Sequence, residues 1–130
     1  MRHLDGTAGD VVVVDDDDKL AAVIVRALEL AGYHCRVAAS GDQTLWAVND
    51  HPPDALVLDV MIPHPSGIEV CRHLRAGGYD GVIVVISARS NPDDYAAAQR
   101  AGADRFLAKP FALSDLVANL DELLGGVTIA

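Results

Sequence analysis

The sequence is short of cysteine and lacks any long apolar run, and each absence excludes a class of protein. Its two cysteines, Cys35 and Cys71, lie far apart without the close spacing typical of a metal site. We therefore expect two buried free thiols of a cytosolic protein, not a disulfide. The apolar run before Asp15 holds only four valines and follows an acidic segment. It predicts neither a signal peptide nor a helix that spans a bilayer.

Basic residues are also scarce. The chain has 10 Lys and Arg against 19 Asp and Glu, which gives a formal net charge of −9. Binding to nucleic-acid phosphates needs clustered Lys and Arg, so a direct nucleic-acid partner is not expected. A dinucleotide-binding fold is excluded because no G-x-G-x-x-G run follows the first apolar segment.

Short β-branched runs alternate with segments of helical periodicity along the 130 residues. Continuous apolar runs suit strands that are covered on both faces, as in parallel sheets. The pattern predicts one α/β domain with a five-stranded parallel sheet and helices on both faces. We divide the chain into a flexible leader (1–10), one domain (11–124) and a short tail (125–130). The predicted strands cover residues 11–14, 35–38, 55–58, 82–86 and 105–107.

Side chains that cap helices support this division. Ser66 with Glu69, and Ser40 with Gln43, match the capping box, in which each side chain accepts from the other residue's amide. Asn91 precedes a proline and fits the N-cap position of another helix. These signals place helix starts between the predicted strands.

Polar groups follow four of the five predicted strands directly. Asp15 and Asp16 follow the first strand, Asp59 ends the third, Ser87 follows the fourth and Lys109 the fifth. The carboxyl ends of parallel strands share one rim of the sheet, where open α/β folds place their chemistry. Clustered carboxylates need a cation among them, and oxygen ligands without His or Cys favour Mg²⁺ or Mn²⁺. A metal, a carboxylate nucleophile and an anion clamp together predict a phosphoryl-transfer site.

The run of four aspartates divides into two pairs. Helical periodicity begins at Leu20, so Asp17 and Asp18 start a helix, where carboxylates cap free amides. Asp15 and Asp16 close the strand and belong to the predicted metal site.

Four segments, "VVVVDDDD", "LVLDVMIP", "VIVVISAR" and "FLAKPF", occur in this order along the chain. Together they resemble the signature regions of the bacterial response-regulator receiver domain of two-component signalling, in its single-domain form. The resemblance covers residues 11–124. It implies a flavodoxin-like, doubly wound (βα)5 fold with sheet order 2-1-3-4-5, which places the ends of the first and third strands side by side.

The resemblance also implies roles for individual residues. Asp59 would accept a phosphoryl group from a sensor histidine kinase or a histidine phosphotransfer protein. Asp16 would bind Mg²⁺ directly, Asp15 would assist, often through water, and the backbone carbonyl of Met61 would supply a further ligand. Ser87 would donate a hydrogen bond to the phosphoryl group.

Three further residues complete the implied switch. Lys109 would pair with the phosphoryl group, and Pro110 would follow a cis peptide bond that aims this lysine. Phe106 matches the aromatic residue that rotates inward when the hydroxyl of Ser87 moves toward the phosphate. The resemblance thus implies a population shift in a two-state element.

The loop after Asp59 departs from the family pattern. Pro65 and Ser66 stand where the family usually has methionine and aspartate, although Ser66 can still cap the next helix. Two interpretations of His64 stay open: a proton donor or alternative acceptor at the site, and an exposed loop histidine without such a role. Arg89 either tunes dephosphorylation or is a solvated side chain. Trp46, outside this region, is expected to be partly buried.

We expect a cytoplasmic switch that is not a dedicated enzyme. It would phosphorylate and dephosphorylate itself at Asp59 and would act through contact with a downstream protein effector. One alternative is an unphosphorylated receiver-like docking module. Another is a phosphatase of the haloacid-dehalogenase type, whose nucleophile ends the first strand in a D-x-D-G-T-like run. Asp15 and Asp17 satisfy the D-x-D part, but Asp18 and Lys19 replace Gly-Thr.

Overall fold

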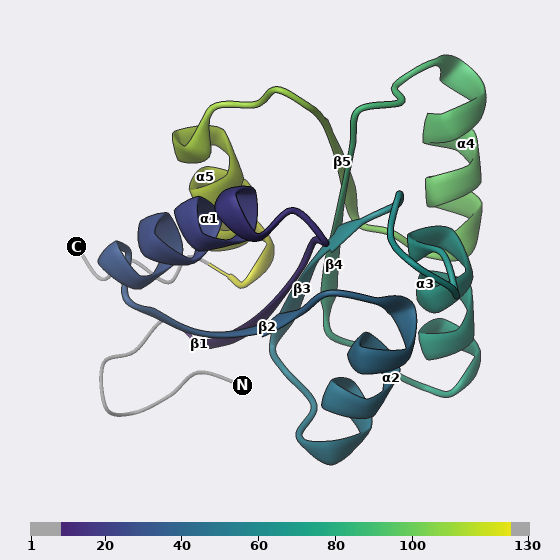
Figure 1. The fold of residues 1–130 in the computed structure, drawn as a ribbon, viewed down its shortest axis with the longest axis horizontal. Helices are drawn as coiled ribbons and strands as arrows, with labels where there is room; N and C mark the ends of the chain where they lie inside the picture. The colour runs from purple at the N-terminus through teal and green to yellow at the C-terminus, as the bar shows by residue number, and fades with distance from the viewer. Residues whose placement is uncertain (1–8, 126–130) are drawn as a thin grey trace.

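The computed structural model describes residues 9–125, and its centre is a five-stranded parallel sheet (Figure 1). The strand order is β2-β1-β3-β4-β5. This confirms the predicted doubly wound fold and places the ends of β1 and β3 next to each other. The strands are β1 (Gly9–Val14), β2 (Tyr33–Ala38), β3 (Ala55–Asp59), β4 (Val82–Ser87) and β5 (Arg105–Ala108).

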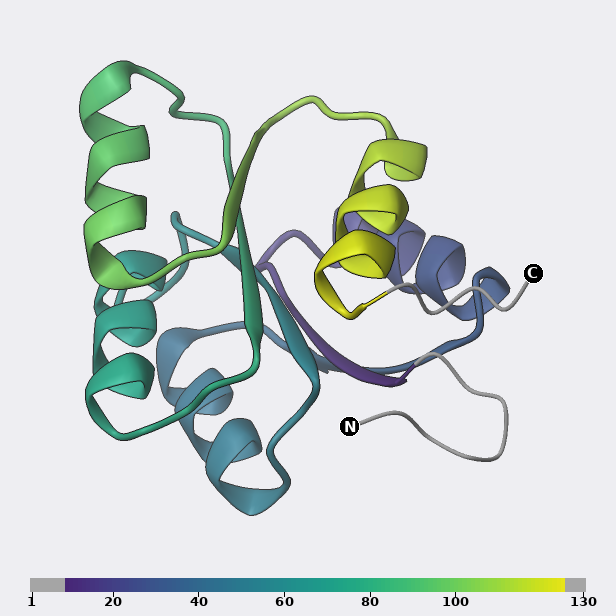
Figure 2. The same ribbon diagram turned by 180° about the vertical axis from the view of Figure 1, so that it is seen from behind.

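Five helices connect the strands and cover both faces of the sheet. Figures 1 and 2 show α1 (Asp18–Leu30) and α5 (Leu113–Leu123) together on one face. The other face carries α2 (Gly41–Asp50), α3 (Gly67–Ala76) and α4 (Pro92–Ala101). Each strand is therefore followed by a helix, and all five strands run in the same direction.

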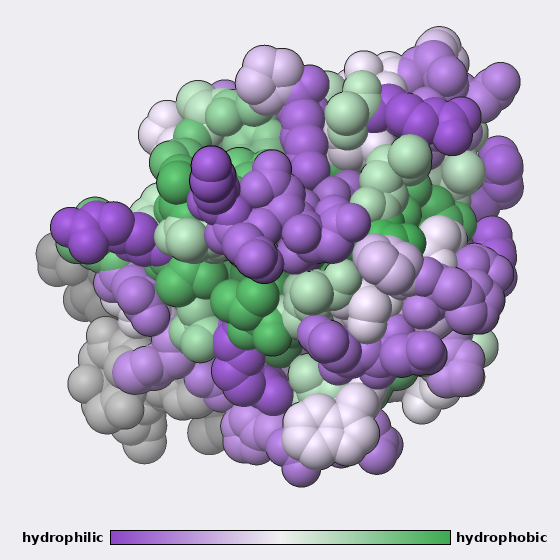
Figure 3. Space-filling model, in the orientation of Figure 1, coloured by the Kyte–Doolittle hydropathy of each residue, from purple (hydrophilic) through white to green (hydrophobic). Residues whose placement is uncertain are grey.

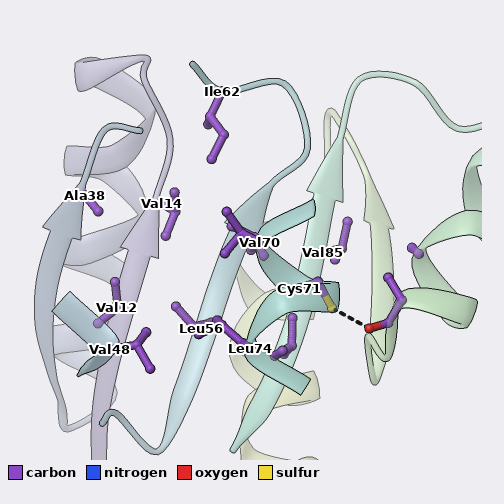
Figure 4. Close-up of a cluster of buried hydrophobic side chains, with 14 residues drawn as sticks. Val12, Val14, Ala38, Val48, Leu56, Ile62, Val70, Cys71, Leu74 and Val85 are labelled. Atoms are coloured by element: carbon purple, nitrogen blue, oxygen red, sulfur yellow. Dashed lines mark hydrogen bonds between the residues drawn. The ribbon is translucent and has the colours of Figure 1, made fainter. Parts of the chain in front are cut away.

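Alternate residues of each strand supply the two halves of the core. Val12 and Val14 of β1 pack toward α2, α3 and α4, whereas Val11 and Val13 pack toward α1 and α5. Figure 4 shows the first cluster, in which the thiol of Cys71 donates to the carbonyl of Ala101 at 3.3 Å. Because a strand points successive side chains to opposite faces, an unbroken valine run fills both layers.

Most of the predicted caps are present. Ser66 and Glu69 form the complete capping box at the start of α3, and Asn91 caps α4. At α2, the hydroxyl of Ser40 accepts from the amide of Gln43, as predicted. The reciprocal bond of the capping box is absent at α2: the side chain of Gln43 accepts from the amide of Ala39 at 2.8 Å, and not from the amide of Ser40.

Two strands begin earlier than the apolar runs indicated. β1 begins at Gly9 and β2 at Tyr33, because backbone pairing continues through residue pairs such as Asp10 and His34. Backbone hydrogen bonds do not depend on apolar side chains, so hydropathy misses such strand ends. The predicted leader falls mostly on residues 1–8, and the tail on 126–130; both lie outside the described residues.

The prediction that Trp46 is partly buried is wrong, because 69% of this residue is exposed. The buried residues of α2 include Thr44 and Val48, which lie one helical turn apart, and Trp46 lies midway between them on the opposite side. Figure 3 shows hydrophobic residues among many hydrophilic ones on the surface. No described helix is long and apolar enough to cross a membrane. Both cysteines are free; Cys71 is buried as expected, but Cys35 is only partly buried.

Candidate functional site

The carboxyl ends of four strands bring polar side chains together at one edge of the sheet. Asp15 follows β1 and Asp59 ends β3, and both carboxylates are almost fully buried. Asp16 is exposed, yet each of the three aspartates offers an oxygen within 4.8 Å of the others. Ser87 is buried at the end of β4. The three predicted metal-binding carboxylates therefore form one cluster.

The same local turn fixes three of these side chains. Asp15 Oδ1 accepts from the amide of Asp17 at 2.9 Å, and Asp59 Oδ1 accepts from the amide of Met61 at 3.0 Å. In the same way the hydroxyl oxygen of Ser87 accepts from an amide two residues further on. Asp and Ser side chains form such turns readily at the ends of strands. Each turn holds its side chain in one orientation before any ligand binds.

Lys109 joins the two buried carboxylates. Its ammonium group donates to Asp15 Oδ2 at 2.9 Å and to Asp59 Oδ2 at 2.9 Å. One oxygen of each aspartate is thus held by a backbone amide and the other by the lysine. Hydrogen bonds between charged groups are stronger than neutral ones, so this pair of contacts stabilises two carboxylates that would otherwise repel each other.

The backbone around Lys109 is fixed by its neighbour in the sheet. The amide of Lys109 donates to the carbonyl of Ser87 at 2.8 Å, which extends the pairing of β4 with β5. The peptide bond between Lys109 and Pro110 is cis, the bond for which the resemblance implied this form. A second cis bond, which the sequence did not indicate, joins His64 to Pro65.

Burial and charge act in opposite directions on these groups. Burial raises the pKa of Asp59 above its ordinary value, and the hydrogen bonds from Lys109 and Met61 oppose this only in part. Burial alone would lower the pKa of Lys109. Its hydrogen bonds to Asp59 and Asp15 outweigh that effect, so the pKa of Lys109 is raised. The lysine is therefore charged at neutral pH.

The cluster fits a hard divalent cation. Its donors are carboxylate oxygens, and Asp16 opens it to solvent. Oxygen donors with an open side are typical of Mg²⁺ sites that keep water or phosphate ligands. The amide of Met61 donates to Asp59, and Met61 as a whole residue is 53% exposed.

The remaining candidate residues are not members of this cluster. Phe106 is half-buried on β5, and its ring lies 4.3 Å from that of Tyr95 on α4, centroid to centroid. Arg89 is exposed, and its guanidinium lies 3.7 Å from a carboxylate oxygen of Asp94. His64 is exposed. A separate groove between α2 and α3 has none of the cluster residues in its lining.

The sequence prediction missed the backbone amides that orient the acidic groups. The amide of Asp17 donates to the carboxylate of Asp15, so Asp17 contributes to the site as well as to the predicted helix start. Asp17 is indeed the N-cap of α1, where its carboxylate accepts from the amides of Lys19 and Leu20. The tendency of aspartate to accept from an amide two residues ahead was a signal that could have identified this contact.

A family model, described as the response regulator receiver domain, matches residues 11–121. The chain belongs to this family. Response regulator MprA of Mycobacterium avium (strain 104) is 44% identical over 114 residues, which are 88% of this chain and 50% of that protein. The MprA of Mycobacterium sp. (strain KMS) is 43% identical over the same shares. This receiver domain thus spans about half the length of the curated relatives it matches.

Solved receiver structures have the same fold. A putative response regulator from Chloroflexus aurantiacus J-10-fl is 34% identical, with a TM-score of 0.85 over 89% of this chain and 97% of that chain. The BeF3-activated N-terminal receiver domain of Klebsiella pneumoniae RstA is 27% identical, with a TM-score of 0.84 over 89% and 98%. The chain is therefore a receiver domain of response regulators in two-component signalling. This result favours the receiver interpretation over the phosphatase alternative.

Because the curated relatives are about twice as long as the match, two sequence predictions stay open. The absence of a direct nucleic-acid partner is not confirmed, since those relatives extend beyond the matched region. The single-domain form is likewise untested. Receiver domains interact with histidine kinases, and the particular kinase of this chain is a matter for experiment.

Proposed function

We propose that the receiver domain accepts a phosphoryl group on Asp59 from a phosphohistidine of a sensor kinase or phosphotransfer protein. A carboxylate oxygen of Asp59 would form the new P–O bond while the P–N bond of the donor breaks. The imidazole of the donor leaves and takes up a proton from solvent. The same site would take phosphate from a small donor and would lose it by hydrolysis.

The observation that carries this proposal is the environment of Asp59. The carboxylate is buried at a strand end, with one oxygen bonded to the amide of Met61 and the other to Lys109. A nucleophile held in one orientation needs little further ordering before attack. Asp15 has similar contacts, so the choice of Asp59 rests on the resemblance of the segment "LVLDVMIP" to the family's acceptor region.

We propose Mg²⁺, with Mn²⁺ as a substitute, as the cofactor. Asp15, Asp16 and Asp59 would hold the ion, with the carbonyl of Met61 as an additional ligand. A divalent cation at this position would neutralise the negative charge of the acidic cluster and of the incoming phosphoryl oxygens. The proximity of the three carboxylates supports this assignment.

Lys109 and Ser87 would hold the transferred group. Lys109 is charged and already lies beside Asp59, so it can pair with a phosphoryl oxygen. Ser87 is buried at the adjoining strand end, and its hydroxyl proton is available because the oxygen accepts from the amide of Arg89. Movement of this hydroxyl would draw Phe106 inward and would alter the surface that a downstream protein contacts. Arg89 and His64 are candidates to tune the lifetime of the phosphoryl group.

The location of this switch would be the cytoplasm, and its output would pass through contact with another protein. Both statements are inferences from the receiver family. A profile of phosphotransfer from individual histidine kinases would identify the donor.

The central experiment measures the intact mass after incubation with acetyl phosphate and Mg²⁺. We expect a gain of about 80 Da, the mass of one phosphoryl group on an aspartate nucleophile. The variant Asp59→Asn should show no gain, whereas Asp18→Asn should label like the natural chain. Equal labelling of Asp59→Asn would overturn the assignment. Omission of Mg²⁺ should slow the labelling, which tests the proposed cofactor separately.

A further inference from the structure

The first residue of α2, Gly41, lies against the loop that follows Asp59. It is buried, and a β-carbon added to it would lie 2.0 Å from the carbonyl oxygen of Pro65. The same β-carbon would lie 2.7 Å from the ring Cδ and 2.7 Å from the nitrogen of Pro65. These atoms belong to the backbone and to a rigid ring, so they cannot move aside as a flexible side chain would. Any larger residue at this position must displace the loop.

The glycine at position 41 is not explained by backbone conformation. Positive φ values occur at Gly9, Gly32, Gly78, Gly102 and Gly125 among the described glycines, and not at Gly41. Alanine favours a helix more than glycine does, so Gly→Ala at the start of a helix costs nothing in propensity. The close approach of Pro65 is the property that requires a missing side chain.

A hydrogen bond fixes the same contact. The amide of Gly41 donates to the carbonyl of Pro63 at 2.9 Å. The loop is also held at both ends, where the amide of Val60 donates to Ile86 at 3.1 Å and the amide of Gly67 donates to Val60 at 3.0 Å. Pro65 stands two residues before Gly67, so a displacement forced by α2 would strain the hydrogen bond from Gly67 to the carbonyl of Val60.

The peptide unit between Val60 and Met61, whose carbonyl accepts from Gly67, carries the amide that orients Asp59. The amide of Met61 donates to Asp59 Oδ1 at 3.0 Å, and Met61 stands two residues before Pro63. A shift of the loop would lengthen or tilt this bond. The carboxylate would then be held by Lys109 alone and would sample more orientations.

We propose that Gly41 is a positioning residue for Asp59: its missing side chain lets Pro65 pack on α2 and thereby fixes the amide of Met61. Gly41 itself touches neither the metal cluster nor a phosphoryl group. Its consequence for phosphorylation rests on the function proposed for Asp59, whereas its effect on the Met61 amide does not.

The test compares Gly41→Ala with two controls. Gly77→Ala is the matched control, because its added β-carbon would meet its nearest atoms at 3.5 Å and 3.6 Å, which are ordinary contacts. Leu120→Ala is the stability control, because Leu120 is fully buried in the layer between the sheet and α1 and α5. It should destabilise the fold without touching the loop.

Two quantities are measured on each variant. The first is the chemical shift and hydrogen-exchange protection of the Met61 amide by NMR. The second is the dissociation constant for Mg²⁺. We expect Gly41→Ala to lose protection at Met61 and to bind Mg²⁺ roughly 10-fold to 100-fold more weakly, the range seen when groups that orient a ligand are lost. Gly77→Ala and Leu120→Ala should retain both properties.

The proposal is overturned if Gly41→Ala keeps the Met61 amide signal and the Mg²⁺ affinity of Gly77→Ala. It is also overturned if Leu120→Ala loses as much Mg²⁺ affinity as Gly41→Ala. Failure of the natural chain to gain a phosphoryl group would instead refute the proposed function, and the Met61 signal would still decide the role of Gly41.

A second variant covers the case in which Gly41→Ala folds poorly. Pro65→Gly removes the ring and frees the backbone of the loop, so the double variant should accommodate the new methyl group. We expect the double variant to bind Mg²⁺ about as well as Pro65→Gly alone, a non-additive result typical of residues in contact. If the losses of Mg²⁺ affinity in Gly41→Ala and Pro65→Gly simply add in the double variant, the two positions are not directly coupled.

Discussion

The ammonium group of Lys109 lies 2.9 Å from a carboxylate oxygen of Asp59, although the two residues are 50 positions apart in the sequence. The same ammonium lies 2.9 Å from Asp15. In this arrangement one cation holds two buried anions. The lysine therefore has a structural role in the unphosphorylated receiver, in addition to its proposed contact with the phosphoryl group.

Removal of this lysine should destabilise the fold. Lys109→Met leaves two adjoining buried carboxylates without their cation, and breaking a buried pair in this way costs about 3–5 kcal/mol. Urea unfolding at neutral pH measures the loss. Mg²⁺ should restore part of the stability, because it supplies positive charge to the same cluster. Lys19→Met, at the exposed other lysine of the chain, should change stability little; a similar loss there would contradict the assignment.

Substitution of Asp59 should change the pH dependence of stability. Because the pKa of Asp59 is raised, the folded state binds its proton more tightly than the unfolded state. The free energy of unfolding should therefore fall as pH rises from the ordinary pKa of an aspartate to the raised pKa of Asp59, by up to about 1.4 kcal/mol per pH unit. Asp59→Asn should remove this contribution and be more stable than the natural chain at pH 7 without Mg²⁺. The difference should disappear below the ordinary pKa of an aspartate, and denaturation across a pH series checks it.

Substitutions in the two pairs of aspartates should have different effects, one on Mg²⁺ affinity and the other on stability. Asp16→Ala removes a member of the acidic cluster, so we expect its Mg²⁺ affinity to fall at least about tenfold. Asp17→Ala removes the N-cap of α1 and should lose about 1 kcal/mol of stability while it keeps most of its Mg²⁺ affinity. Calorimetric titration and urea unfolding measure the two effects. Equal losses of Mg²⁺ affinity would mean that the division of the run is wrong.

The capping box of α3 should be detectable as a lowered pKa of Glu69. The amide of Ser66 donates to the carboxylate of Glu69 and lowers its pKa. This stabilising contribution is present above the ordinary pKa of a glutamate and is lost as pH falls through the lowered pKa. Ser66→Ala removes the reciprocal bond and should raise the pKa of Glu69 toward its ordinary value, as measured by carboxyl NMR. An unchanged pKa in the variant would show that the box does not hold Glu69.

Most of the architecture could be read from local patterns. Strands buried on both faces need unbroken apolar runs, so β1 and β3 were recognisable, and so was the rim on which their polar ends meet. Helix starts were recognisable because Asp17, Ser66 and Asn91 satisfy amides only a few residues away. The candidate site followed from the same logic, because Asp15 and Asp59 stand directly at the ends of those apolar runs.

The strand ends were less well predicted, and so was the exposure of α2. Backbone pairing carries β1 back to Gly9, which hydropathy cannot indicate. Trp46 was expected inside and lies outside, because the face that α2 buries is set by how the helix sits on the sheet. A single large apolar residue on a helix does not reveal which face the rest of the domain will cover.

Local sequence patterns specify the order of strands and helices, most of the caps, and which carboxylates stand at which strand end, because these depend on short-range periodicity and on side chains near their own backbone. The contacts of Lys109 with Asp15 and Asp59, and of Gly41 with Pro65, became visible only in the folded domain. These contacts join segments far apart in the chain. Their geometry depends on how whole elements pack, and no local pattern specifies a distance between two such segments.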